Sequence, residues 1–342
     1  MFKRTCAFAV AILSSTGVFA NNFFPNAEED RPVWSLTGQG NYIEQSSNLA
    51  GWVETRDYYT DLSTVKSFNE SGSNWGWADE LGYLFPNHVN DIQLTYSGTR
   101  NSAANEVNDY DSSVLLPNPL APGYDVSEAS SASVAADFNY DVVDVTFGNY
   151  FDITECFSVR VGYGLSYVNI NQSADATYYD VYAGYDEVYD DYTSHQKSQF
   201  EGFGPKLTLD TQWTMGQGFY LVNGLGFSAI YGNANAQYNG VVPLGDDQVA
   251  SAGEYDENYD FSYSEKRMAF GFDSKLGVRF QHMIVPGYDF AIEGGYRGTT
   301  YLNAMYEGSA GVSAYNRGNA YEFGDNDYFN FGPYLAVNVN YL

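Results

Sequence analysis

Apolar and polar residues alternate with a period of two along much of this chain. In the segment from residue 157 to 168, one set of positions is apolar or aromatic: Phe157, Val159, Val161, Tyr163, Leu165 and Tyr167. The positions between them are small, polar or charged. Because successive side chains of a β-strand point to opposite faces, the pattern predicts a strand with one apolar face and one polar face.

The same alternation predicts about ten strands in all. The stronger ones span residues 91 to 97, 203 to 213, 268 to 281, 288 to 297 and 335 to 341, and the weaker ones span 33 to 43, 77 to 85, 139 to 148 and 218 to 231. We expect strands of about 10 to 15 residues, which suffice to cross a bilayer because about 9 to 11 tilted residues are needed.

The connections between these strands are alternately short and long. Short ones lie near residues 86 to 88, 152 to 155, 215 to 217 and 285 to 287, and long ones occupy roughly 45 to 75, 99 to 136, 171 to 197, 232 to 265 and 302 to 328. Short periplasmic turns opposite long extracellular loops are typical of bacterial outer-membrane barrels. We therefore predict an all-β fold, a closed antiparallel transmembrane β-barrel of about ten strands, within a range of about 8 to 12.

Aromatic residues gather near the expected strand ends. They include Trp34 and Tyr42, Trp75 and Trp77, Tyr83 and Phe85, Tyr150 and Phe151, and Trp213 and Phe219. This distribution predicts the two aromatic girdles of a membrane barrel, with scattered surface aromatics as the alternative. The high counts of tyrosine (32), phenylalanine (23) and glycine (34) also suit short, twisted strands.

The N-terminus predicts an export signal. Lys3 and Arg4 precede an apolar segment over residues 6 to 13, and residues 18 to 20 form a small-residue cleavage site. The apolar segment is much shorter than the roughly 20 residues of a spanning helix. We expect a cleaved signal peptide over residues 1–20 and a single outer-membrane barrel domain over residues 21–342, without a separate periplasmic domain.

The chain is strongly acidic. Its 43 Asp and Glu against 15 Lys and Arg give a formal charge of −28, which excludes nucleic acid as an expected partner. Most acids fall in the long connections, for example at residues 106 to 111, 186 to 191, 246 to 247 and 254 to 260. Solvation of the loops is one interpretation, and a negative mouth that concentrates cations is the other. We expect no metal ion and no cofactor, since the acids show no calcium-binding motif.

Charged residues on the polar faces of the predicted strands are candidates for a pore lining. The acidic ones are Glu80, Asp91, Asp144, Asp210, Asp273 and Glu293, and the basic ones are Arg160, Lys206, Lys275, Arg279 and Arg297. These lumen candidates form either a constriction that selects solutes or a salt-bridged plug in a narrow barrel. Interior size leaves both interpretations open, because eight strands only just hold their own side chains.

Two further residues need separate treatment. His195 is the one histidine expected at the extracellular end and the only candidate base there, so a lone solvated histidine is a simpler interpretation than an enzyme. We expect no catalytic residues. Cys156 lies beside a predicted periplasmic turn in an oxidising compartment, which suggests an interchain disulfide as a hypothesis; a thiol without a bond is the alternative.

Three segments carry a family resemblance. They are residues 76 to 96, with Glu80-Leu81-Gly82-Tyr83-Leu84-Phe85-Pro86 and Asn90-Asp91-Ile92-Gln93-Leu94-Thr95-Tyr96; residues 138 to 148; and residues 200 to 206. On these, the chain resembles the pore-forming outer-membrane family typified by the Legionella major outer membrane protein. The resemblance implies a porin-like channel at the cell surface, disulfide cross-linking between subunits and a part in attachment to host cells. The last four residues depart from the usual aromatic ending of such barrels, since the chain ends on Leu342.

The sequence as a whole predicts a porin of the bacterial outer membrane. Its expected partners are outer-membrane lipid, small hydrophilic solutes or ions, other copies of the chain through Cys156, and a host surface. A preference for cations follows if the acidic loops set the field at the mouth. The alternative is a closed barrel that does not conduct and serves as an adhesin or as a structural protein of the envelope.

Overall fold

The computed structural model describes residues 31–46, 53–57, 63–66, 74–108, 113–117, 126–183, 188–189, 191–242, 257–310 and 321–342. The expected signal peptide lies outside these residues. Across the described segments, helices long and apolar enough to cross a membrane are absent.

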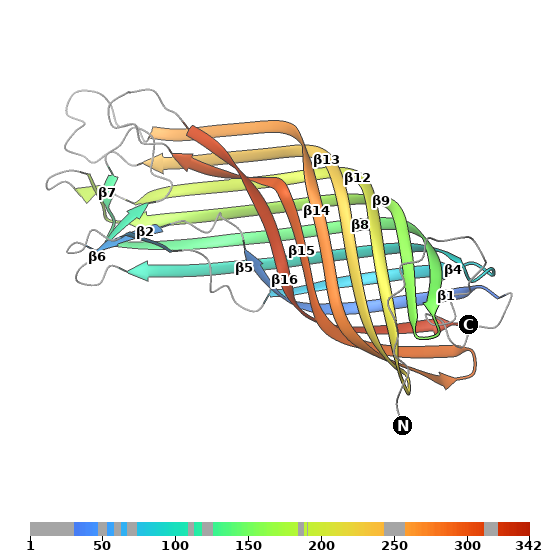
Figure 1. Cartoon of the computed structure of the whole chain (residues 1–342). Helices are drawn as coiled ribbons and strands as arrows, with labels where there is room; N and C mark the ends of the chain where they lie inside the picture. The colour runs from blue at the N-terminus through green and yellow to red at the C-terminus, as the bar shows by residue number, and fades with distance from the viewer. Residues whose placement is uncertain are drawn as a thin grey trace.

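Ten antiparallel strands form a closed, hydrogen-bonded ring (Figure 1). In chain order they are β1 (Val33–Ser46), β4 (Asn74–Leu84), β5 (Asn90–Asn108), β8 (Ser131–Thr154), β9 (Phe157–Tyr179), β12 (Tyr192–Gly216), β13 (Phe219–Val242), β14 (Glu257–Val285), β15 (Tyr288–Ala310) and β16 (Tyr321–Tyr341). Each pairs with the next, and β1 pairs with β16 from Trp34 opposite Tyr341 to Ser46 opposite Phe329. The predicted all-β barrel is confirmed.

Short strands lie in the long connections between barrel strands. They are β2 (Val53–Asp57), β3 (Ser63–Lys66), β6 (Ser113–Pro117), β7 (Val126–Glu128), β10 (Val181–Ala183) and β11 (Val188–Tyr189). They form two three-stranded sheets, β3-β2-β6 and β11-β10-β7. Since β2 pairs with β6 and β7 pairs with β10, the first three long connections are tied to one another.

The four tight turns lie at one end of the barrel. They connect β4 to β5, β8 to β9, β12 to β13 and β14 to β15. Gly218 and Gly287 adopt positive φ angles of 82° and 85° in two of them, a conformation that glycine adopts at low cost. The long connections lie at the opposite end, so this arrangement identifies the turn end as periplasmic and the other end as extracellular.

The membrane-facing surface is a belt of exposed apolar side chains. On β9 these are Val161, Tyr163, Leu165 and Tyr167, as the alternation predicts. The aromatic residues expected in the girdles are mostly exposed as well, with Trp34, Trp75, Trp213 and Phe219 among them. Tyr150 is an exception. It was expected in a girdle, but it points into the barrel and is 2% exposed, because its hydroxyl donates to buried Asp91.

Most strands are longer than the predicted 10 to 15 residues: β9 has 23 and β14 has 29, whereas β1 has 14 and β4 has 11. The reason is that the apolar residues of a strand pass from its outer face to its inner face along the chain. On β9, the continuous run of outward-facing apolar residues ends at Tyr167, and Val168 and Ile170 are fully buried inside. Beyond this level the inner side is apolar and the outer side is polar. The change removes the apolar outer stripe that marks a membrane strand, so these segments resembled loops in the sequence.

Close backbone contact allows neighbouring strands to pack at certain glycines. A Cβ added at Gly164 on β9 would lie 1.8 Å from the carbonyl oxygen of Val145 on β8. The same distance separates a Cβ at Gly332 on β16 from the carbonyl oxygen of Tyr42 on β1. Any other residue at these two positions would push the adjacent strand away.

Replacement of Gly164 by alanine is expected to destabilise the barrel by about 1 to 3 kcal/mol, because the added carbon overpacks the β8–β9 contact. The measurement is the midpoint of urea unfolding in lipid vesicles. Gly40→Ala is the matched control, because nothing lies within 4 Å of a Cβ at that strand glycine. Equal midpoints for the two variants would contradict the explanation.

Candidate functional site

A charged cavity of about 180 Å³ lies inside the barrel. Ten of the eleven lumen candidates line it: Glu80, Asp144, Arg160, Lys206, Asp210, Asp273, Lys275, Arg279, Glu293 and Arg297. The eleventh, Asp91, is buried beside them and accepts hydrogen bonds from Arg160. The period-two pattern brings these side chains together because each lies on the inner face of its strand.

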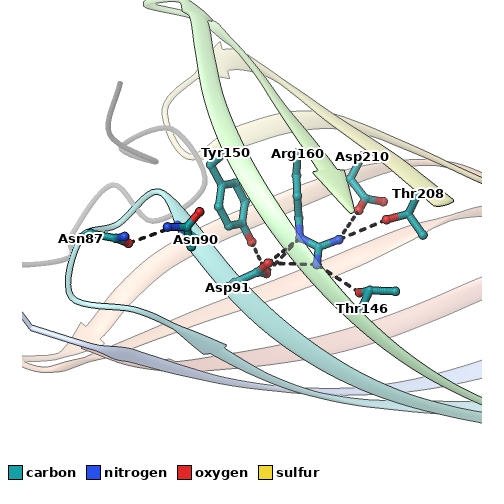
Figure 2. Close-up of polar contacts among 8 residues, drawn as sticks. All are labelled: Asn87, Asn90, Asp91, Thr146, Tyr150, Arg160, Thr208 and Asp210. Atoms are coloured by element: carbon teal, nitrogen blue, oxygen red, sulfur yellow. Dashed lines mark hydrogen bonds and ion pairs between the residues drawn. The ribbon is translucent and has the colours of Figure 1, made fainter. Parts of the chain in front are cut away.

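Arg160 on β9 is the centre of the largest group of polar contacts, shown in Figure 2. Its guanidinium donates to both oxygens of Asp91 at 2.9 to 3.0 Å, and Asp91 also accepts from the hydroxyl of Tyr150 at 2.9 Å. The Nη1 nitrogen of Arg160 donates to Asp210 at 3.1 Å. The guanidinium also donates to the hydroxyls of Thr146 and Thr208. Arg160 thus joins β5, β8 and β12 from inside the barrel.

Lys206 on β12 forms a second group. Its Nζ donates to Asp144 on β8 and to Asp273 on β14, both at 2.7 Å. Asp273 also accepts from the hydroxyl of Thr299 on β15 at 2.8 Å. One ammonium between two carboxylates leaves this group with a net negative charge.

Glu293 on β15 forms the third group. Arg279 on β14 donates to it through Nε at 2.8 Å, and Lys275 lies 3.6 Å away. The hydroxyl of Tyr334 on β16 donates to its other oxygen at 2.7 Å. These contacts satisfy a carboxylate that is 5% exposed, as a buried charge requires.

Glu80 on β4 and Arg297 on β15 differ from the other lumen charges. Both line the cavity. Among the described residues, neither makes a side-chain hydrogen bond or an ion pair within 4 Å. The electric fields of these two charges therefore act on any ion or solute in the cavity.

Apolar side chains border the cavity at the periplasmic end. Val33, Leu84 and Tyr150 form a small buried cluster, and Leu342 packs against it. The last residue, which departs from the usual aromatic ending, therefore packs inside the barrel.

A larger apolar core fills the interior on the extracellular side. Its members are Tyr140, Val142, Val168, Ile170, Phe200, Ile230, Ala234, Ala236, Ala269, Tyr301, Ala304, Met305, Tyr306 and Tyr328. They come from β8, β9, β12, β13, β14, β15 and β16. Tyr140 stacks on Tyr328 with ring centroids 5.3 Å apart, and it also contacts Tyr301 at 6.1 Å. We call this group the lumen core.

An irregularity in β15 places part of the lumen core. The β15–β16 register shifts between Tyr301 and Met305, and Asn303 within this bulge has a φ of 59°. The backbone N–H of Asn303 donates to Asp327 at 2.7 Å. Beyond the bulge, the backbone N–H of Tyr306 donates to Ser198 of β12, a strand that is not adjacent to β15 in the ring. The bulge therefore brings β15 inward across the barrel.

Sequence reasoning missed this core. Its signal is present as adjacent apolar residues that break the alternation, because the apolar stripe passes from the outer to the inner face. Val142-Val143, Tyr167-Val168 and Ile230-Tyr231 are such doublets. It also missed Tyr150 and Tyr334, whose hydroxyls donate to lumen carboxylates.

The other candidates lie outside the cavity. His195 pairs with Asp175 at 2.5 Å on the outer side of β12. The thiol of Cys156 lies 3.5 Å from Thr154 Oγ1 in the β8–β9 turn, and an interchain disulfide there remains a prediction. Acidic residues 109, 111, 186, 187, 190, 246, 247, 254 and 256 lie outside the described residues, and within the described part no cluster of potential metal ligands is found.

The ring of ten strands, the apolar outer belt and the polar cavity define a closed outer-membrane β-barrel. Residues 26–341 match the family described as the Legionella pneumophila major outer membrane protein precursor. The chain therefore belongs to the Legionella major outer membrane protein family, in the lipid of the bacterial outer membrane.

Comparison with other proteins gives only distant similarity. No curated protein matches the sequence. Similar solved structures include the outer membrane protease OmpT from Escherichia coli, at 10% identity, 90% coverage of this chain, 96% of that chain and a TM-score of 0.41. A FadL homologue from Pseudomonas aeruginosa has 9% identity, coverage of 91% and 90%, and a TM-score of 0.27. The toluene transporter TodX from P. putida has 6% identity, coverage of 94% and 92%, and a TM-score of 0.28.

Replacement of Arg160 by methionine is expected to destabilise the barrel by about 3 to 5 kcal/mol, because it leaves Asp91 buried without a countercharge. Urea unfolding in lipid vesicles measures the effect. Asp91→Asn combined with Arg160→Met is expected to cost less than the sum of the two single changes, since the partners are removed together. Additive costs would show that the pair is not coupled.

Proposed function

We propose that this barrel is a porin through which ions and small hydrophilic solutes diffuse passively, and that the conformation described is closed. The observation that carries the proposal is the polar interior at membrane level. All eleven predicted lumen charges lie on inner strand faces around or beside one cavity. Two of these charges, Glu80 and Arg297, form no ion pair with other described residues and are available to a passing ion.

The energetic argument concerns the cost of buried charge. Removing an ion from water costs several kcal/mol even after relaxation, and an apolar filling of similar volume is often as stable as a buried ion pair. A barrel with only a structural role would need no charged interior. The same chain fills the lumen core with apolar side chains, so apolar filling is available to this fold. The charged layer is therefore better explained by the passage of polar solutes.

The buried side chain of Gln172 is evidence that the lumen core can open. Its side chain is 1% exposed, on the inner face of β9 between Ile170 of the lumen core and the buried Ala174. Both of its amide atoms lack a hydrogen-bond partner among the described residues. An unsatisfied buried amide costs about 1 to 3 kcal/mol, and water in an open lumen would remove that cost. The amide therefore favours a hydrated state.

The lumen core also favours a second candidate function. A barrel whose extracellular half is filled by stacked Tyr140 and Tyr328 conducts nothing while that core stays in place. Such a barrel would serve as a surface adhesin or as a structural protein of the envelope. Planar-bilayer recordings distinguish the two functions: stepwise openings from the purified, folded chain support the porin, and silence from verified barrel refutes it.

Selectivity is expected to depend on Glu80 and Arg297, the two lumen charges that form no ion pair within the described part of the chain. Glu80→Gln should lower the permeability ratio of K⁺ to Cl⁻, and Arg297→Gln should raise it, because each change removes one fixed charge from the cavity. The measurement is the reversal potential in a KCl gradient. Asp79→Asn is the control, since Asp79 neighbours Glu80 but faces outward. We also expect the wild-type channel to prefer cations, because its long connections are rich in acidic residues. Shifts of equal size in all three variants would contradict the assignment.

Loss of the stacked tyrosines is expected to favour opening. Tyr140→Ala with Tyr328→Ala removes an aromatic pair worth about 0.5 to 1.5 kcal/mol, which shifts a two-state equilibrium roughly two- to tenfold. Single-channel open probability measures this shift. Tyr296→Ala is the control, because Tyr296 is an exposed aromatic on the outer face. Unchanged open probability in the double variant would show that the lumen core is not the gate.

A further inference from the structure

A polar surface covers the outer wall of the barrel just beyond the membrane-facing belt. It lies on β8, β9, β12, β13 and β14, which continue as paired neighbours there (Figure 1). It consists of three rows of residues in register: Asp141, Asn169, Glu201, Asn233 and Lys266; Asn139, Asn171, Gln199, Asn235 and Ser264; and Asp137, Ser173, Lys197, Gln237 and Ser262. No residue in these rows is apolar. We call this surface the outer polar face.

The outer polar face begins where the aromatic belt ends. Tyr167 on β9 and Tyr231 on β13 are exposed one outward position below it. The hydroxyl of Tyr167 donates to Glu201 at 2.8 Å, at the lower edge of the face. Aromatic side chains with such polar tips mark the level of lipid headgroups. The face therefore stands beside the headgroup layer of the outer leaflet.

The chemistry of the face suits a ligand rich in hydroxyl groups. Seven of its side chains are amides, each with both donors and an acceptor. The carbonyl oxygens of Asn169 and Asn171 are buried and have no hydrogen-bond partner among the described residues. A ligand hydroxyl can donate to these oxygens only if the side chains rotate outward. Sugar hydroxyls both donate and accept, so they match a row of amides on a flat sheet.

The face carries two lysines that are available for anionic groups, together with the three carboxylates of Asp137, Asp141 and Glu201. Lys197 and Lys266 face outward, and in the described parts of the chain neither forms an ion pair. Lys206, inside the barrel, is held between two carboxylates instead. An ammonium without a carboxylate partner is a suitable contact for phosphate.

The inner side of the same strands keeps the face rigid. Phe200, Ile170 and Ile230 are fully buried in the lumen core behind it. The strands also run unbroken in register through all three rows. A ligand on this surface thus meets preorganised side chains and loses less affinity to their ordering.

We propose that the outer polar face binds the phosphorylated saccharide headgroup of a glycolipid in the outer leaflet. The amide rows hydrogen-bond the sugar hydroxyls, and Lys197 and Lys266 contact the phosphates. This interaction does not depend on whether the lumen conducts.

Binding of labelled rough lipopolysaccharide to the full-length barrel in detergent micelles tests the proposal. Asn171→Ala, Gln199→Ala and Asn235→Ala, combined in one variant, are expected to raise the dissociation constant at least about tenfold. Binding of phosphatidylglycerol, which carries phosphate without an oligosaccharide, should stay unchanged in this variant. Lys197→Gln with Lys266→Gln should weaken lipopolysaccharide binding but have no effect with dephosphorylated lipopolysaccharide.

Gln93→Ala with Thr95→Ala is the control, because these side chains line the internal cavity. A heat-dependent gel shift verifies that each variant is folded. Wild-type affinity of the triple variant for lipopolysaccharide would overturn the proposal. An equal loss of phosphatidylglycerol binding would also overturn it, because the face would then not distinguish a saccharide from other headgroups.

Discussion

The structure depends on the backbone hydrogen bonds that join β1 to β16. In hydrocarbon an unpaired N–H or C=O has no alternative partner, so an open sheet edge at membrane depth would be strongly unfavourable. Once the ring is closed, alternate residues along each strand face the interior and the outside of the barrel. The eleven lumen charges are inside for this reason, although their strands lie far apart in the sequence.

The interior is filled in two different ways. At membrane level, charges meet in three groups around Arg160, Lys206 and Glu293, and each group joins several strands. Toward the extracellular end, aromatic and aliphatic side chains replace them. A ring of this size is only slightly wider than one that its own side chains fill, so modest changes of packing decide whether it holds water. The bulge at Asn303 is the local feature that brings β15 into the interior.

A single strand therefore passes through two environments with opposite requirements. On β9, Leu165 faces lipid while Ser166 faces the interior, and a few residues later Ile170 faces the interior while Asn171 faces outward. The reversal coincides with the end of the hydrocarbon, where water and headgroups can solvate a polar outer surface. The apolar face then has only the barrel interior in which to be buried.

The sequence by itself determined the closed barrel, a strand number of about ten and the inward direction of the eleven charges, because period-two alternation and alternating loop lengths are local properties of the chain. It also placed the four tight turns. Only the tertiary structure decided which charges pair and that Glu80 and Arg297 form no ion pair with another described residue, since pairing depends on the register of strands far apart in sequence. It likewise decided that Tyr150 turns inward to Asp91 and that Tyr140 meets Tyr328 across the lumen. Such contacts exist only after the ring has closed.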